Sequence, residues 1–358
     1  MKRVALLTSG GDCQSLNAAM RGVAKSLYEA IDEIEIYGIF EGYKGLIYEN
    51  YTLLQPSDFF NILNEGGTMI GTSRQPFKLM RTPDANGLDK VEAMKKTYKK
   101  LKLDCLIILG GNGTHKTANL LREEGLNVVT LPKTIDNDIW GTDMTFGFQS
   151  AVDIATESID CIRTTAASHR RIFIVEIMGH KVGWLTLHAG IAAGADIILI
   201  PEIPYDIDVI VKAIEKRTKG GNRSSIIAVA EGAISVEDSL LSKKELKIKK
   251  KSVSYPSISY KIAKEVEERL GQEIRITVPG HMQRGGSPCA YDRVISTRLG
   301  AAAAELVMKE QYGYMVAIRE GEIVPVPLSE VAGKLKMVEP EASIIKEARS
   351  IGVCFGDK

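Results

Sequence analysis

Two carboxylates placed two residues apart are the groups of this chain best suited to chemistry. Asp136 and Asp138 belong to the segment Pro-Lys-Thr-Ile-Asp-Asn-Asp at 132–138, which also contains Lys133 and Thr134. One carboxylate can accept a proton from a hydroxyl group while the other holds a metal ion or its water. A simpler interpretation is an Asp-rich turn, because Asp and Asn favour turns by bonding their own backbone.

An apolar run in front of the carboxylates indicates where they lie. Residues 126–131, Leu-Asn-Val-Val-Thr-Leu, predict a buried strand. The carboxylates would then follow the C-terminal end of that strand, which is where open α/β sheets bind their ligands. The turn and the catalytic interpretation both remain open on this evidence.

Three predicted strands end in glycine-bearing loops, at 8–12 (Thr-Ser-Gly-Gly-Asp), 110–114 (Gly-Gly-Asn-Gly-Thr) and 178–180 (Met-Gly-His). Glycine lets backbone N–H groups approach a ligand closely, and a following helix N-terminus favours anions. A single loop of this kind is usually a plain strand–helix connection, but two at adjacent strands favour a phosphate site. The chain has neither G-x-x-x-x-G-K-[ST] nor G-x-G-x-x-G, which excludes a P-loop and a dinucleotide fingerprint by pattern.

A fourth cluster, Pro-Gly-His-Met-Gln-Arg-Gly-Gly-Ser-Pro at 279–288, places His281 three residues before Arg284. Arg can bind phosphate with two parallel hydrogen bonds, and His adds a donor. Arg74 and Arg171 are further basic residues at element ends, although each could equally be a surface ion-pair partner. Together these features suit transfer of a phosphoryl group between two anionic ligands, which requires positioning and charge neutralisation.

Apolar runs alternate with amphipathic segments along the chain, which predicts an α/β fold. The expected strands are 4–7, 34–39, 105–109, 128–131, 171–177, 197–200, 225–230 and 274–278. The expected helices are 17–30, 90–102, 116–124, 150–164, 183–193, 207–219 and 261–270. We expect two doubly wound three-layer α/β/α lobes with mostly parallel sheets and the active site in the cleft between them. The expected parts are 1–140, 141–282 with a helical insertion at 233–272, and a C-terminal segment, 283–358, that packs on both lobes.

Composition narrows the functional classes. The 358 residues exceed the usual size of one domain, and 44% are hydrophobic and 25% charged, as in ordinary globular proteins. The net charge of +1 gives no sign of a nucleic-acid partner. Five cysteines without a C-x-x-C pair indicate reduced thiols in a cytoplasm, and no apolar run approaches the ~20 residues of a membrane helix. The Lys-rich insertion is expected to be a solvated helical segment, with an anion or effector contact as the alternative.

Taken in order, the motifs at 8–12, 110–114, 132–138, 175–179, 230–232 and 279–288 resemble those of the 6-phosphofructokinase family. The resemblance runs from residue 4 to about residue 310, and the motif at 279–288 is highly specific. In that family a nucleoside triphosphate or pyrophosphate phosphorylates the 1-hydroxyl group of fructose 6-phosphate, with Mg²⁺ as the cofactor. The resemblance therefore implies a glycolytic phosphotransferase.

The resemblance also implies roles for individual residues. Asp136 would be the general base, Thr134 would hold the sugar beside it, and Asp138 with Asn112 would support Mg²⁺. The donor would be bound by Gly11, Arg74, Gly111, Asn112, Gly113 and Thr114. The sugar phosphate would be bound by Thr134, Asp136, Met178, Gly179, His180, Glu231, His281 and Arg284, and by Arg171 and Arg275 from a neighbouring subunit. Arg171 would also act in catalysis, so a homo-oligomer, dimer or tetramer, is expected to form the site.

The chain departs from the family pattern at several positions. Asn112 stands where an acidic metal ligand is usual, and His180 replaces a common Arg. Gly113 leaves room for a nucleotide and favours ATP, because pyrophosphate users typically carry Asp there. Lys133, however, is a residue that pyrophosphate users share. We expect ATP as the donor, and the alternatives are a pyrophosphate-dependent enzyme and a non-catalytic sugar-phosphate-binding subunit.

Overall fold

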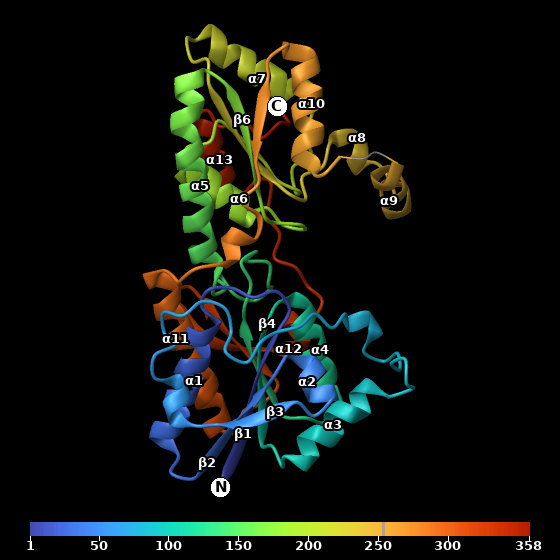
Figure 1. The fold of residues 1–358 in the computed structure, drawn as a ribbon, viewed down its shortest axis with the longest axis vertical. Coiled ribbons are helices and arrows are strands. Elements are labelled where there is room, and N and C mark those ends of the chain that lie inside the picture. The colour runs from blue at the N-terminus through green and yellow to red at the C-terminus, as the bar shows by residue number, and fades with distance from the viewer. Residues whose placement is uncertain (253–254) are drawn as a thin grey trace. The chain divides into compact units, whose positions relative to one another are not determined.

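The computed structural model describes residues 1–252 and 255–358, and within them the chain forms two compact units (Figure 1). Unit 1 consists of Met1–Ser150 and Arg284–Lys336, and unit 2 consists of Ala151–Gln283 and Met337–Lys358. Each unit contains one sheet with helices on its faces. This arrangement confirms the α/β class.

The sheet of unit 1 has the strand order β11-β10-β5-β4-β1-β2-β3. Its strands are β1 (Lys2–Ser9), β2 (Ile34–Ile39), β3 (Tyr51–Leu54), β4 (Cys105–Gly110), β5 (Val128–Pro132), β10 (Tyr314–Arg319) and β11 (Glu322–Pro327). The inner pairs are parallel, whereas the edge strands β3 and β11 pair antiparallel with β2 and β10. β4 and β5 are buried along their whole length, so both are mostly apolar and show no alternation of apolar and polar residues in the sequence.

Helices cover both faces of this sheet. They are α1 (Leu16–Ala30), α2 (Tyr43–Ile47), α3 (Lys90–Lys100), α4 (Asn112–Glu123), α11 (Ala290–Met308) and α12 (Leu328–Val331), with 3₁₀ turns η1 (Pro56–Phe59) and η2 (Phe77–Leu79). Figure 1 shows α1 beside α11 on one face and α2, α3 and α4 on the other. α1 and α11 approach closely at Gly22, where a Cβ atom would lie 2.8 Å from the Thr297 carbonyl oxygen. Asp89 caps α3 by accepting hydrogen bonds from the backbone N–H groups of Val91 and Glu92.

Unit 2 contains a wholly parallel four-stranded sheet in the order β7-β8-β6-β9. Its strands are β6 (Ile172–Ile177), β7 (Ile197–Leu199), β8 (Ser225–Ala230) and β9 (Ile274–Thr277). Its helices are α5 (Phe148–His169), which begins in unit 1, α6 (Trp184–Ala192), α7 (Ile207–Lys219), α8 (Val236–Ser239), α9 (Lys243–Ser252), α10 (Ile258–Leu270), η3 (Gly280–Arg284) and α13 (Ser343–Ser350).

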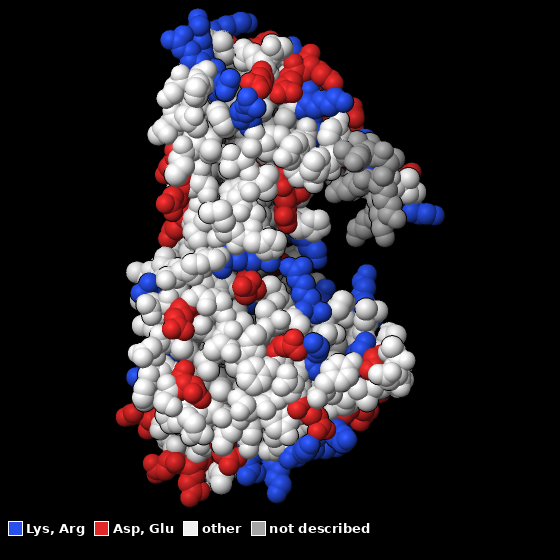
Figure 2. Space-filling view, viewed as in Figure 1, with Lys and Arg blue, Asp and Glu red and all other residues white. Residues whose placement is uncertain are grey.

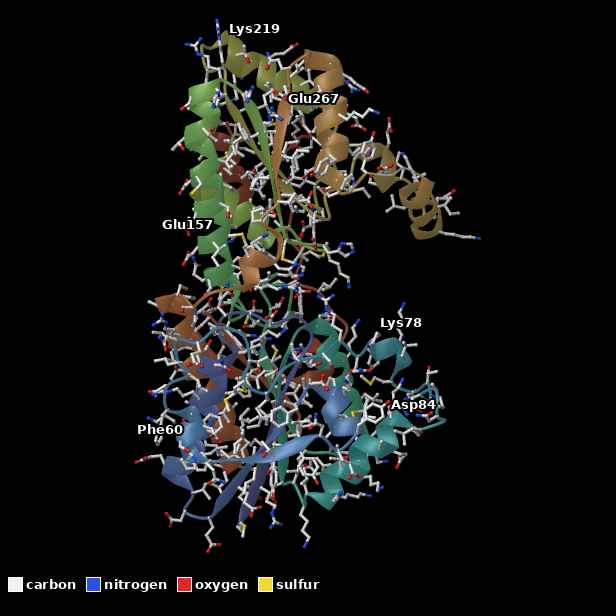
Figure 3. The ribbon with its side chains drawn as sticks, viewed as in Figure 1. Phe60, Lys78, Asp84, Glu157, Lys219 and Glu267 are labelled. Atoms are coloured by element: carbon white, nitrogen blue, oxygen red, sulfur yellow. The ribbon has the colours of Figure 1, made fainter. Side chains whose placement is uncertain are left out.

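The core of unit 2 joins its sheet to α7 and α10. Apolar side chains of these two helices, among them Ile210 and Ile262, pack with Ile174 and Val229 of the sheet. Glu267 on α10, labelled in Figure 3, accepts a hydrogen bond from the Ile274 backbone N–H at 2.7 Å. That bond fixes the start of β9 against α10. In Figure 1 α5 and α6 lie on the opposite face of the sheet.

The structure corrects several expected elements. The helix expected at 116–124 begins earlier, at Asn112, because the glycine-rich segment at 110–114 contributes its last three residues to the first turn of α4. The strands β3, β10 and β11 and the long helix α11 were not predicted. The expected lobe limits, 1–140 and 141–282, were drawn from the positions of motifs in the sequence, whereas the two units are defined by contacts in the folded chain. The expected limits therefore stay a prediction.

Surface charge and helix composition agree with the totals in the sequence. The face of unit 1 shown in Figure 2 carries both acidic and basic side chains, and over the whole sequence the two signs nearly cancel. Within residues 1–252 and 255–358, the helices all fall short of the length and apolar character that a bilayer crossing demands.

Candidate active site

Two glycine loops of unit 1 lie side by side. β1 and β4 are parallel neighbours, with Ser9 opposite Gly110, so the loops that follow them leave the same edge of the sheet. Gly10 has φ of +90°, a conformation that side chains other than glycine adopt only with strain. A Cβ atom at Gly110 would overlap the Thr114 side chain. The expected pair of adjacent glycine loops is therefore present.

Two cationic side chains flank the first loop. Lys133 is 3% exposed, and its Nζ donates to the Gly11 carbonyl oxygen while its backbone N–H donates to Gly110 at 3.0 Å. A Cβ atom at Gly11 would lie 3.1 Å from the Arg284 guanidinium carbon. Burial and the nearby Arg284 lower the pKa of Lys133, although Cys13 and carboxylates oppose the shift. An anion placed here would restore the balance of charge.

The second loop opens directly into α4. Gly111 is the N-cap residue, and the first turn of this 12-residue helix carries no acidic side chain, so its positive end is uncompensated within the helix. His115, which is 1% exposed, places its Nδ1 2.8 Å from the Gly111 carbonyl oxygen. Burial lowers the pKa of His115 to about 4. The ring is therefore neutral near pH 7 and holds the loop without adding charge.

The residues expected to bind the donor differ in their surroundings. A Cβ atom at Gly113 would meet no heavy atom of the described residues within 4 Å, so this position is open. Thr114 is buried, and its Oγ1 donates to the Ser9 carbonyl oxygen at 3.4 Å. Asn112 donates through Nδ2 to the Lys334 carbonyl oxygen. Arg74 is exposed and follows Ser73, whose carbonyl oxygen accepts from Gly10 N at 3.0 Å.

The carboxylates lie directly after β5, as expected. Thr134, Asp136 and Asp138 are partly exposed, whereas the residues between them are buried. The Asp136 backbone N–H donates to Thr134 Oγ1 at 3.1 Å. Asn137 has φ of +52°, which Asn tolerates, and its Oδ1 accepts from Thr145 N at 3.0 Å. The turn interpretation thus applies to Asn137, and the turn presents both carboxylates at the strand end.

Lys336 is a cation beside this turn that sequence reasoning missed. Its backbone N–H donates to the Asp138 carbonyl oxygen at 3.0 Å, and its Nζ donates to the Asp143 carbonyl oxygen at 2.7 Å. Burial lowers the pKa of Lys336 to about 8, opposed by Asp143 and Asp138. No pattern in the sequence links residue 336 to residue 138, because the contact depends on the return of the chain to unit 1.

In unit 2 a buried glutamine ties the motif at 279–288 to the end of β6. Gln283 is fully buried, its Oε1 accepts from Met178 N at 3.1 Å, and its Nε2 donates to Gly280 O at 3.1 Å. This leaves His281 exposed in the same 3₁₀ turn. Gln283 was not predicted as a site residue, although it lies between His281 and Arg284, which were. Its hydrogen bonds position the turn.

The ends of β6 and β8 bring four expected residues together. Gly179 has φ of +142°, and its carbonyl oxygen accepts from Gly232 N at 3.1 Å. A Cβ atom at Gly232 would overlap the His180 carbonyl oxygen, so close packing requires glycine there. Met178, Gly179 and His180 therefore lie beside Glu231. His180 and Glu231 line one cavity of about 430 Å³.

Arg171 and Arg275 lie elsewhere in unit 2. Arg171 directly precedes Ile172 of β6, and Arg275 directly follows Ile274 of β9, which lies opposite Ile172. Both arginines form ion pairs with Glu273, Arg171 at 3.4 Å and Arg275 at 2.7 Å. Met178 follows the opposite end of β6. The structure therefore separates these two arginines from the other expected sugar-phosphate residues of the same unit.

Comparisons with known proteins agree on one family. The family model described as phosphofructokinase matches residues 3–307. The ATP-dependent 6-phosphofructokinase of Spirochaeta thermophila is 55% identical over 98% of this chain and 97% of its own length. ATP-dependent 6-phosphofructokinase 3 of Bacteroides thetaiotaomicron is 44% identical over 99% of this chain and all of its own.

Solved structures show the same fold. The phosphofructokinase of Pichia pastoris matches with a TM-score of 0.78 and 32% identity, over 98% of this chain and 36% of that longer chain. A pyrophosphate-dependent phosphofructokinase from Nitrosospira multiformis matches with a TM-score of 0.82 over 99% of this chain, and at 19% identity it shows the fold alone. From its motifs, its fold and these relatives, the chain belongs to the phosphofructokinase family.

Proposed function

We propose that this chain is an ATP-dependent 6-phosphofructokinase, which transfers the γ-phosphoryl group of ATP to the 1-hydroxyl group of fructose 6-phosphate. The product is fructose 1,6-bisphosphate, and the enzyme is a phosphotransferase of glycolysis. The observation that carries this proposal is the 55% identity, over nearly both full lengths, to a relative named for this activity.

The donor is proposed to bind at the two glycine loops of unit 1. Backbone N–H groups at Gly11 and Gly111 and the positive end of α4 suit a polyphosphate. Lys133 adds a cationic side chain beside Gly11, and Arg284, which is proposed to bind the sugar phosphate, lies next to the same loop. Arg74, next to the Gly10 loop, is proposed to neutralise charge on the transferred group, since phosphoryl transfer depends on charge neutralisation more than on covalent chemistry.

Asp136 is proposed to act as the general base. Its carboxyl group is partly exposed at the end of β5, beside Thr134. The carboxylate would take the proton from the 1-hydroxyl group as that oxygen attacks phosphorus, and Thr134 would hold the sugar in place. Positioning of the two reactants supplies much of the rate in such a reaction.

Magnesium is proposed to bind at Asp138 with support from Asn112. Within residues 1–252 and 255–358, no group of three or more His, Cys, Asp or Glu side chains is placed to hold a metal ion. One carboxylate and one amide oxygen, from Asp138 and Asn112, fit Mg²⁺, because this ion commonly binds one or two protein carboxylates and completes its coordination with water and substrate phosphates. The amide nitrogen of Asn112 is engaged by Lys334, which leaves its oxygen as the group that can face the ion. When bound, the ion would neutralise charge on the phosphates.

Sugar-phosphate binding is proposed for Met178, Gly179, His180, Glu231 and His281 of unit 2, together with Arg284. Arg171 and Arg275 are proposed to serve the site of a neighbouring copy in a homo-oligomer. Their half-exposed positions at the N-terminal ends of β6 and β9 support this, because a second copy can reach them.

ATP is proposed over pyrophosphate because position 113 is open space that a nucleotide can use. Pyrophosphate is the second candidate, since Lys133 is the residue that pyrophosphate users share and it contacts the donor loop. One coupled assay decides between them by measuring fructose 1,6-bisphosphate formed from ATP, GTP and pyrophosphate. Turnover with ATP supports the proposal, turnover with pyrophosphate alone supports the second candidate, and no product from any donor contradicts both.

A further inference from the structure

The helical insertion of unit 2 borders a cavity, and the residues that the insertion contributes to its lining have no role in the reaction as described. The cavity of about 430 Å³ is lined on one side by His180 and Glu231 at the strand ends. On the other side it is lined by Leu246 and Lys249 of α9 and by Tyr255, directly before α10. Its volume lies within the range of small-molecule sites, which is roughly 300–1,000 Å³.

A single carboxylate joins the three helices of the insertion. Asp238, at the end of α8, is 8% exposed. Its Oδ1 accepts from Lys249 Nζ of α9 at 2.5 Å, and its Oδ2 accepts from Lys261 Nζ of α10 at 2.8 Å. Burial alone would raise the pKa of Asp238, but the hydrogen bonds from the two lysines lower it overall. The position of α9 beside the cavity therefore depends on this ionised carboxylate.

The polar groups at the cavity suit a hydroxylated ligand. Ser257, which lines it, has a buried Oγ with no hydrogen-bond partner among the described residues. Buried hydroxyl groups normally form hydrogen bonds, so the Ser257 hydroxyl group can form one with a ligand in the cavity. Glu176 is engaged at the N-terminus of α10, where its Oε2 accepts from Ser259 N at 3.3 Å. Glu231 and His180, which also line the cavity, are exposed and can form hydrogen bonds with the hydroxyl groups of a sugar.

We propose that the insertion is a wall of the sugar-phosphate site, with Tyr255 and Ser257 facing the phosphorylated hexose and Asp238 holding that wall in place. The proposal rests on the proposed function, because Glu231 and His180 are the residues assigned to the sugar phosphate there. It gives the Lys-rich insertion a role in acceptor binding, where sequence reasoning left it solvated and without function.

The test compares Asp238→Asn and Tyr255→Ala with the parent chain. Asp238→Asn weakens the link between the helices, and Tyr255→Ala removes part of the wall. We expect KM for fructose 6-phosphate to rise about tenfold in each, with KM for ATP within about twofold. Calorimetry without ATP should show the same weakening of fructose 6-phosphate binding. Glu268→Gln is the matched control, since it removes an exposed carboxylate of α10 whose pairing with Lys264 is at 4.0 Å.

The outcomes separate this inference from the proposed function. A parent chain that forms no fructose 1,6-bisphosphate contradicts the proposed function. An active parent, with both variants unchanged in KM and in binding of fructose 6-phosphate, overturns the role of the insertion and leaves the function standing. Equal changes in the KM values for both substrates would also overturn it, because they indicate a general structural effect. If Asp238→Asn does not fold, Tyr255→Ala decides the question alone.

Discussion

Lys133 illustrates how single side chains organise the donor loops. Its ammonium group and its backbone N–H each contact a different glycine loop, at Gly11 and Gly110. The sequence marked Lys133 as a residue of donor choice, and the structure adds that it is buried and ties the loops together. Its neighbour at the loops, Gly113, offers the most direct test of donor choice.

Gly113→Asp should strongly reduce the use of ATP while leaving the fold intact. A Cβ atom there meets no described heavy atom within 4 Å, so the side chain fits, but its carboxylate repels phosphates and fills the space proposed for the nucleotide. We expect kcat/KM for ATP to fall about 100-fold, with an unchanged melting temperature. Asn222→Asp, which adds one charge in a loop of unit 2, is the control. A variant that uses ATP as well as the parent would contradict the spatial account of donor choice.

His115 makes a prediction about pH. The unfolded chain takes up a proton on this ring as the pH falls below 6.5, whereas the folded chain does so only near 4. Stability contributed by the neutral ring is therefore complete above pH 6.5 and is lost as the pH falls towards 4. This amounts to about 3 kcal/mol at pH 4. His115→Asn, which keeps a donor for the Gly111 carbonyl oxygen, should show a shallower fall in the free energy of unfolding between pH 7 and 4. Equal slopes for the two proteins would contradict this assignment.

At the scale of elements, α11 positions the start of α5. Asp292 of α11 is fully buried and accepts hydrogen bonds from Gly147 N at 3.1 Å, Ser150 N at 2.7 Å and Ser150 Oγ at 2.5 Å. These bonds fix the start of α5, which follows Asp136 and Asp138 in the sequence. A buried carboxylate with three donors is costly to neutralise, because each donor loses a charged acceptor.

Asp292→Asn should therefore destabilise the protein by about 2–4 kcal/mol, measured by urea unfolding. The amide keeps the shape of the side chain but turns an NH₂ group towards groups that donate. Asp89→Asn is the matched control, since Asn caps a helix as well as Asp does and α3 should be unaffected. A similar loss of unfolding free energy in both variants would show that the hydrogen bonds of Asp292 do not stabilise the protein more than an ordinary helix cap does.

Sequence patterns predicted the inner elements well and the edges poorly. β4, β5 and β8 are mostly apolar runs followed by glycine or polar residues, and such runs are typical of buried parallel strands. β10 was missed because its parallel partner β5 lies far away in sequence, and β11 was missed with it because β11 joins the sheet only through β10. The position of Asp136 and Asp138 after a strand was predicted correctly because the strand and the carboxylates are close together in sequence. Lys336 and Gln283 were missed because their roles arise from contacts that only the folded chain makes.

At the scale of the whole molecule, the proposed shared site gives a test by subunit mixing. Asp136→Asn removes the proposed base, and Arg171→Ala removes the arginine proposed to serve a neighbouring copy. Each variant alone should be nearly inactive. When the two are unfolded and refolded together, about a quarter of the sites in random dimers should combine an intact Asp136 with an intact Arg171. Activity that stays at the level of the separate variants would contradict a site shared between copies.

The base itself is tested most directly by the turnover number of Asp136→Asn with ATP and fructose 6-phosphate. Asn preserves the size of the side chain but cannot accept the proton of the 1-hydroxyl group. General base catalysis typically supplies a factor of about 100 to 10,000, so kcat should fall by that factor while KM for ATP changes little. A variant that turns over as fast as the parent would contradict the assignment of Asp136 as the base.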